Sequence, residues 1–202
     1  MHKTIVIIFT LLLMVSMTAC PTCGGGADPQ IEYFHLIGFE PQIRHIERNV
    51  ETKSINYQKV TDTIFYNHYT IYMYPKTKYV GVGYHFSLIP AAYACVPPPI
   101  QQSDETIENI EIITHQDFDS THLAGSNIID LFKILDPENV QEEYSIDEYL
   151  KKYPNPHRNG ISFLLRKSPH QTGEYSFSFK YYQSGGEVEY IEVQIDKNIL
   201  II

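Results

Sequence analysis

The densest group of metal-binding residue types in this chain lies within residues 115–122. Its members are His115, Asp117, Asp119 and His122. Imidazole nitrogen suits zinc and carboxylate oxygen suits calcium or zinc, so a metal-dependent hydrolase is one hypothesis for this segment. In an extended backbone, the first three side chains share one face and His122 lies on the other. Because the spacing matches no established ligand motif, we favour a polar loop over a metal site.

Other catalytic patterns are missing from the sequence. It contains no Gly-x-Ser-x-Gly turn, and no Ser or Cys stands at a diagnostic spacing from a base. Gly81 and Gly83 belong to a strand pattern and not to a phosphate-binding loop. Acidic residues are abundant, but no pair stands out as the two carboxylates of a glycoside hydrolase. The sequence therefore predicts a non-enzymatic protein that requires no cofactor.

Cys20 follows a pattern that indicates export. Lys3 precedes an apolar run over residues 5–15, and mostly small residues fill positions 16–19. The run has the length of a signal-peptide core and is shorter than the ~20 residues that span a bilayer. Residues 1–19 are therefore predicted to be a signal peptide that is absent from the mature protein.

The tetrapeptide Met17-Thr18-Ala19-Cys20 resembles the lipobox of bacterial lipoproteins, with Met where Leu is usual. The resemblance implies that Cys20 carries a lipid anchor, with acyl chains such as palmitate, and becomes the mature N-terminus. Each buried methylene of such chains adds ~0.8 kcal/mol, so the membrane is an expected partner. Pro21, in place of the Asp that often retains lipoproteins at the inner membrane, implies the outer membrane. The alternative is an ordinary secretory leader with an incidental cysteine.

Cys23 and Cys95 remain in the predicted mature protein. The space beyond the inner membrane is oxidising, so a disulfide between them would tie the start of the chain to the folded domain. The alternative is one buried and one exposed thiol, since a sequence does not supply the Cα separation that a disulfide requires. Zinc binding by Cys20 with Cys23 is disfavoured because lipidation uses the first sulfur.

The predicted mature protein is acidic. Of the 15 Lys and Arg residues one, Lys3, lies in the leader, which leaves 14 against 24 Asp and Glu and a net charge near −10. Phosphate backbones repel such a chain, so nucleic acid is not an expected partner. The 16 tyrosines favour strands and amphipathic surfaces, but the absence of tryptophan gives little indication of sugar binding.

The order of patterns along the chain predicts many short strands. Residues 20–29 form a Gly-rich tether and residues 30–202 a single domain. Alternating or β-branched stretches predict strands over residues 31–39, 63–74, 79–88, 107–114, 161–166, 174–182, 188–195 and 199–202, with a turn at 75–78. The stretch 42–59 is expected to be polar and irregular. Gly185 and Gly186 separate two strands and predict the clearest β-hairpin in the chain.

Two short helices are predicted between the strands. Ser126 can cap a helix over residues 128–135, whose apolar residues fall on one helical face. Ser145 with Glu148 is a capping-box pattern ahead of a second helix that extends to Lys152. Many short strands with two inserted helices favour a mainly β fold, an immunoglobulin-like or Greek-key β-sandwich.

Several stretches of the mature sequence together suggest a family. They are Cys20 with Cys23, Ala92-Tyr93-Ala94-Cys95-Val96-Pro97-Pro98, Ile107-x-x-Ile110-x-Ile112, His122-Leu123-Ala124-Gly125-x-x-Ile128-x-Asp130-Leu131-Phe132 and Gly173-x-Tyr175-x-Phe177. In these stretches the chain resembles small lipoproteins of unknown function from Bacteroides-type bacteria. The resemblance implies a lipid-anchored, β-rich domain and adds no catalytic residue.

Three functional hypotheses follow from the sequence. The first is a lipid-anchored, non-enzymatic module that binds a protein or glycan partner. The second is a periplasmic metal-dependent hydrolase that uses residues 115–122. The third is a structural subunit that pairs sheet edges with a neighbour through the apolar residues 199–202.

Overall fold

A computed structural model describes residues 31–49, 51, 52, 54–60, 62–83, 100–139 and 141–202. Cys20, Cys23 and Cys95 lie outside these residues, so the lipidation and the disulfide stay predictions. The chain divides into two compact units, of which the larger comprises Tyr33–Gly81 and Gln101–Ile202. Apart from the ends of three strands, that unit holds both sheets of the described chain.

The described residues are mainly β, as predicted. The strands are β1 (Ile31–Asn49), β2 (Ser54–Lys59), β3 (Thr63–Ile64), β4 (Tyr69–Gly83), β5 (Ile100–Gln102), β6 (Thr106–Thr114), β7 (Phe132–Leu135), β8 (Glu143–Tyr144), β9 (Ile161–Leu165), β10 (Gly173–Ser184) and β11 (Tyr190–Ile201). The α-helix is α2 (Ile146–Lys152), and 3₁₀ turns cover Tyr66–His68 and Ile129–Leu131. Among the described segments, no helix has the length and apolar character needed to cross a membrane.

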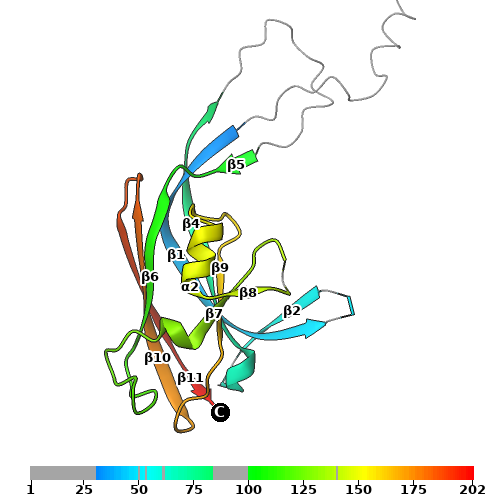
Figure 1. Cartoon of the computed structure of the whole chain (residues 1–202), viewed down its shortest axis with the longest axis vertical. Coiled ribbons are helices and arrows are strands. Elements are labelled where there is room, and N and C mark those ends of the chain that lie inside the picture. The colour runs from blue at the N-terminus through cyan, green and yellow to red at the C-terminus, as the bar shows by residue number, and fades with distance from the viewer. Residues whose placement is uncertain (1–30, 50, 53, 61, 84–99, 140) are drawn as a thin grey trace, which may run out of the picture. The chain divides into compact units, whose positions relative to one another are not determined.

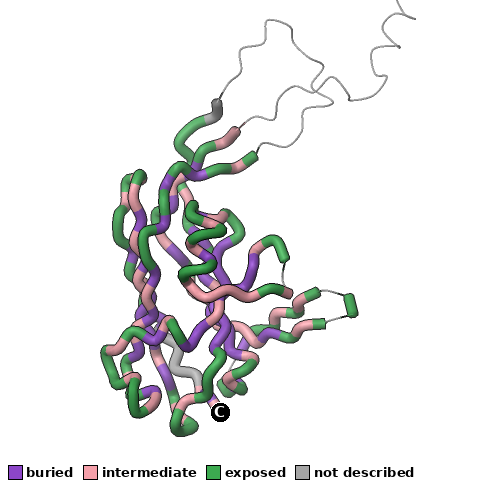
Figure 2. Tube along the Cα trace, in the orientation of Figure 1, coloured by how far each residue is buried: buried purple, intermediate pink, exposed green. Residues whose placement is uncertain are grey.

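The strands build two sheets (Figure 1). The first has the order β2-β1-β4-β9-β7-β8, with β5 also paired to β1, and the second has the order β3-β11-β10-β6. The sheets share one core in which Phe179 of β10 lies 5.5 Å from Phe39 of β1 and 5.4 Å from Phe163 of β9, between ring centroids. Figure 2 shows the buried positions along these central strands.

β1 is longer than predicted, because it continues through the polar stretch that was expected to be irregular. The last residues of β1, from Arg44 to Asn49, pair with the whole of β2. A small apolar cluster separate from the main core holds this hairpin; its members are Ile46, Ile55, Tyr57, Leu135 and Leu164. The alternation of Ile55 and Tyr57 was visible in the sequence, but the partners on β7 and β9 were not.

One of the two predicted helices is present. α2 begins after Ser145, whose N–H donates to the Glu148 carboxylate at 2.8 Å while its hydroxyl accepts the Glu148 N–H at 3.4 Å, which confirms the capping box. The helix predicted over residues 128–135 is wrong, since a 3₁₀ turn and β7 occupy this stretch. Phe132 belongs to the main core and Leu135 to the small cluster, so β7 is buried on both faces. A short apolar run does not distinguish such a strand from a buried helix.

The turn predicted at residues 75–78 is also wrong, because β4 runs through it. β9 pairs with β4 only from Thr70 to Met73, so Pro75 lies beyond the last pair and its missing N–H breaks no bond to β9. The hairpin of β10 and β11 is confirmed, and Gly185 adopts a φ of 88° in its turn. Of the strand predicted over 79–88, the part after residue 83 lies outside the described residues.

The apolar end of the chain is not a free edge. Residues 199–201 belong to β11, where Ile201 pairs with Gly173 of β10 on one side and with Ile64 of β3 on the other. Ile201 is fully buried. Both neighbouring positions are thus occupied, so this segment does not offer the pairing edge that the structural-subunit hypothesis assigned to it.

Candidate functional site

The four predicted metal ligands do not converge. His115 follows β6, and its Nε2 lies 2.7 Å from the hydroxyl of Ser178 on β10. Asp117 Oδ1 accepts a backbone N–H of its own loop at 2.8 Å. Only Asp119 and His122 meet, with 2.8 Å between Asp119 Oδ1 and His122 Nδ1. The structure therefore brings together two of the four side chains.

Asp119 is already engaged by protein groups. Its Oδ2 accepts Lys167 Nζ at 2.8 Å, and its Oδ1 accepts the Thr121 hydroxyl at 2.7 Å. These hydrogen bonds, with Lys167 contributing most, hold the pKa of Asp119 well below its usual range. Within the part of the chain that the structure describes, no group of three or more His, Cys, Asp or Glu side chains is arranged to hold a metal. The segment is a polar loop held by hydrogen bonds within itself and to Lys167 and Ser178.

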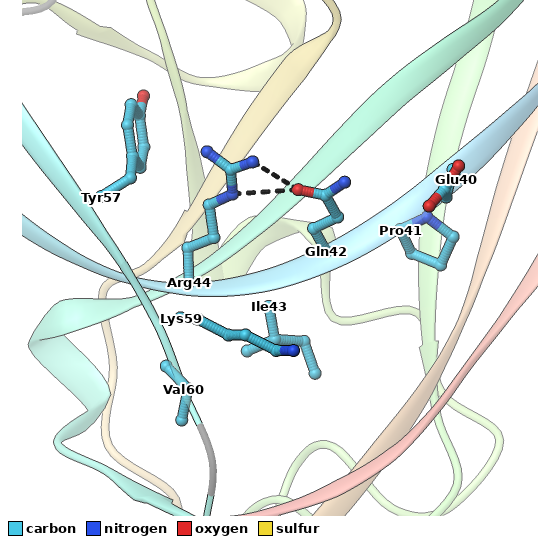
Figure 3. A pocket seen from close by; sticks show the side chains of 8 residues that line it. All are labelled: Glu40, Pro41, Gln42, Ile43, Arg44, Tyr57, Lys59 and Val60. Carbon is cyan, nitrogen blue, oxygen red and sulfur yellow. Dashed lines mark hydrogen bonds between the residues drawn. The ribbon is translucent and has the colours of Figure 1, made fainter.

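Two cavities adjoin the hairpin of β1 and β2. The first, of about 580 Å³, is lined by Glu40, Pro41, Gln42, Ile43, Arg44, Tyr57, Lys59 and Val60 (Figure 3). The second, of about 180 Å³, shares Arg44 and Tyr57 with the first and extends to Tyr72 and Asp136. Arg44 and Tyr57 thus form a wall common to both cavities. We call Gln42, Arg44, Tyr57, Lys59 and Tyr72 the Arg44 site.

The guanidinium group of Arg44 is held in place from several directions. Its Nε donates to Gln42 Oε1 at 3.1 Å, and a second guanidinium nitrogen donates to the same oxygen. Its central carbon lies 5.4 Å from the ring centroid of Tyr57 and 4.9 Å from that of Tyr72. Both distances fall within the ~6 Å over which a cation is attracted to an aromatic face. Figure 3 shows Gln42 and Arg44 on one side of β1 and Ile43 on the other.

Tyrosines continue the site across the sheet. Tyr57 of β2 and Tyr72 of β4 have ring centroids 6.2 Å apart, and Tyr74 lies 6.3 Å beyond Tyr72. Tyr74 is 52% exposed. Burial and the neighbouring Tyr57 raise the pKa of Tyr72, an effect that the charge of Arg44 partly opposes. The Tyr72 hydroxyl donates to the backbone carbonyl of Asn159, so this residue contributes its ring to the site.

The Arg44 site carries an uncompensated positive charge. Arg44 and Lys59 are directly opposite each other in the register of β1 and β2. Like charges in opposite positions destabilise an antiparallel pair. Among the described residues, neither cation forms an ion pair with a carboxylate, including that of Glu40 in the same cavity. This arrangement stands out in a chain whose net charge is −9.

Asp136, in the wall of the second cavity, does not supply the missing negative charge. Its Oδ2 accepts Lys152 Nζ at 2.7 Å and its Oδ1 accepts the Tyr153 hydroxyl at 2.9 Å. Burial alone would raise the pKa of Asp136, but the hydrogen bonds from Lys152 and from the N–H groups of Asn139 and Glu138 outweigh it and hold the pKa well below its usual range. Asp136 is therefore a structural carboxylate.

Sequence reasoning missed the Arg44 site. It expected irregular structure around Arg44 and assigned no binding role to Tyr72. The contributing residues come from β1, β2 and β4, and only the pairing of these strands brings them together. The chain matches no protein-family model, no curated protein and no solved structure at a significant level.

Proposed function

We propose that this chain is a lipid-anchored, non-enzymatic protein of the outer membrane that binds an acidic glycan at the Arg44 site. The pattern that ends on Cys20 supports the anchor, and Pro21 supports the outer membrane. Labelled palmitate supplied to cells tests the anchor. We expect the wild-type protein to incorporate the label and the Cys20→Ala protein to lack it, and equal labelling of both contradicts the anchor.

The observation that carries the binding proposal is the guanidinium of Arg44, 5.4 and 4.9 Å from the centroids of two tyrosine rings, opposite a second cation and beside a cavity. A guanidinium pairs with a carboxylate through two parallel hydrogen bonds. The cavity of about 580 Å³ falls within the ~300–1,000 Å³ typical of small-ligand sites. A sugar that carries a carboxylate combines an anion for Arg44 with an apolar face for a tyrosine ring.

The same cavity favours a glycan over an extended peptide. A peptide that adds to a sheet edge requires a continuous row of backbone donors and acceptors. Pro41 lies in the stretch of β1 that borders the cavity, and it has no N–H to donate. A peptide along this stretch of β1 would therefore lack one backbone donor, whereas a sugar relies on the side chains of Arg44, Lys59 and Tyr57.

Titration calorimetry with an oligogalacturonate tests the ligand class, with the fully methyl-esterified oligomer as the uncharged probe. We expect binding of the acid and not of the ester. Arg44→Ala should weaken binding by about tenfold or more, because a hydrogen bond to a charged group contributes ~1.5–3 kcal/mol and tenfold corresponds to ~1.4 kcal/mol. Lys151→Ala removes a cation from the exposed surface of α2 and is the matched control.

Three results would contradict this proposal: equal affinity for acid and ester, no binding of the acid, or equal losses in Arg44→Ala and Lys151→Ala. Arg44→Lys separates charge from geometry, because lysine keeps the charge but lacks the planar fork. We expect Arg44→Lys to bind more weakly than the wild type and more tightly than Arg44→Ala.

We further propose that the two sheets form an immunoglobulin-like, Greek-key β-sandwich. The chain passes from one sheet to the other between β2 and β3, β3 and β4, β5 and β6, β6 and β7, and β9 and β10. Such crossings between two packed sheets are common in sandwich folds. The core shared by β1, β9 and β10 supports the same assignment. An experimental structure in which these strands do not pack on one another would contradict it.

A further inference from the structure

Large apolar side chains are exposed at one end of the first sheet. Tyr33 and Ile37 of β1 are 36% and 44% exposed, and Tyr79 and Val80 of β4 are 54% and 52% exposed. We call these four side chains the apolar tip. Their removal from water would be favourable by ~25 cal/mol for each Å² buried, so a group of them indicates a contact surface.

The apolar tip combines residues near the start of β1 with residues near the end of β4. β1 and β4 are adjacent in the first sheet. Gly38 of β1 lies beside Lys76 of β4, since a Cβ at Gly38 would be 3.7 Å from Lys76 Cδ. Figure 1 shows the start of β1, in blue, next to the end of β4. Tyr33 and Ile37 therefore lie at the same end of the sheet as Tyr79 and Val80. Because Tyr79 and Val80 are consecutive in β4, their side chains extend from opposite faces of this end, and the apolar tip includes both faces.

The length of the tether limits how far the apolar tip can be from the membrane. Cys20 and Ile31 are 11 residues apart, and the chain between them reaches at most about 40 Å when fully extended. β1 has 19 residues and, at ~3.3 Å per residue, extends about 60 Å if straight. A lipid on Cys20 would therefore keep the start of β1 within about 40 Å of the bilayer, whereas the other end of β1, in the hairpin with β2, could lie up to about 60 Å farther away.

We propose that the apolar tip lies in the interfacial layer of the bilayer, an inference that rests on the proposed anchor at Cys20. Tyrosine is enriched at membrane interfaces, where its ring is buried and its hydroxyl stays in water. Lys76 is exposed next to the tip, and Lys78 pairs with Glu187 at 2.7 Å. A lysine stem can lie along the apolar surface while its charge reaches the headgroups. The anchor and the tip together would fix the orientation of the sheet on the membrane.

The absence of tryptophan from the chain permits a direct test, because one introduced tryptophan reports only its own surroundings. The full-length, acylated protein carrying Tyr79→Trp is reconstituted into phosphatidylcholine vesicles with and without brominated acyl chains, which quench tryptophan by contact. Ile37→Trp is the second reporter. Phe65→Trp is the control: Phe65 is 60% exposed and precedes β4, in which the stretch from Tyr69 to Tyr79 extends about 33 Å.

We expect the Tyr79→Trp and Ile37→Trp proteins to lose most of their emission in brominated vesicles, and the Phe65→Trp protein to lose little. Equal quenching of all three proteins, or quenching of none, overturns the inference. Emission from Tyr79→Trp that is shifted to the blue but unquenched also overturns it, because another part of the chain would then cover the tip.

Palmitate incorporation, measured on the same preparations, separates this inference from the anchor. Incorporated label without quenching at Tyr79→Trp and Ile37→Trp refutes the membrane contact and leaves the anchor intact. Absence of label refutes the anchor, and the membrane contact fails with it.

Discussion

Replacing Gly186 by alanine tests the buried network that ties the turn between β10 and β11 to β1. An alanine Cβ at this position would lie 1.9 Å from Glu105 Oε1 and 2.7 Å from Glu105 Cδ. Real Cβ atoms do not approach other heavy atoms so closely, so the carboxylate or the turn must move. Glu105 is fully buried, so displacing its carboxylate breaks buried hydrogen bonds.

The expected decrease in the free energy of unfolding follows from the hydrogen bonds that Glu105 would lose. Its Oε2 accepts the Leu36 N–H at 2.8 Å and the Ser103 hydroxyl at 3.0 Å, and its Oε1 accepts the Gln183 amide at 3.2 Å. A hydrogen bond to a charged group contributes ~1.5–3 kcal/mol, and bonds within one network are not additive. We therefore expect Gly186→Ala to lower the free energy of unfolding by about 3 to 5 kcal/mol.

Urea unfolding followed by circular dichroism measures this change. Gly81→Ala is the matched control, because Gly81 also lies in the larger unit but a Cβ there meets no atom within 4 Å, and we expect a change of less than ~1 kcal/mol. The same Gly186→Ala substitution should cost less in a Glu105→Ala background, where the obstructing carboxylate is absent. A Gly186→Ala protein within ~1 kcal/mol of the wild type would refute the reasoning.

Two further predictions concern the helix cap and acid stability. Ser145→Ala removes the capping hydroxyl of α2 and should lower the free energy of unfolding by ~1 kcal/mol in the same assay, whereas Ser120→Ala in an exposed loop should not. Because the pKa of Asp136 is lower in the folded protein than its unfolded value of ~3.9, its stabilisation is present above that pH and is lost as the pH falls below it. Urea midpoints between pH 5 and pH 2 should therefore fall more steeply for the wild type than for Asp136→Asn; parallel curves would contradict this assignment.

Local patterns in the sequence determined much of the secondary structure. The capping box of Ser145 and Glu148 and the hairpin turn at Gly185 both depend on residues close together in the chain, and both are present. Alternating apolar residues predicted β6, β9 and β10 for the same reason, since side chains of a strand alternate between its two faces. The acidic composition and the pattern that predicts a leader are also properties of the sequence alone.

The partners of the polar side chains, and the burial of some strands, depend on the tertiary structure. From its sequence position, Asp119 could bind a metal or form hydrogen bonds that hold its loop. In the structure it accepts a hydrogen bond from Lys167, which is far away in the sequence, and so holds the loop. β7 is a strand because partners on both of its faces bury it, and these partners come from distant segments. Arg44, Tyr57 and Tyr72 form one site because strand register opposes residues that are far apart in the chain. The turn and the hydrophobic pattern can set the register of the β1–β2 hairpin, but the pairing of β1 with β4 joins segments far apart in the chain, and no local pattern specifies that partner.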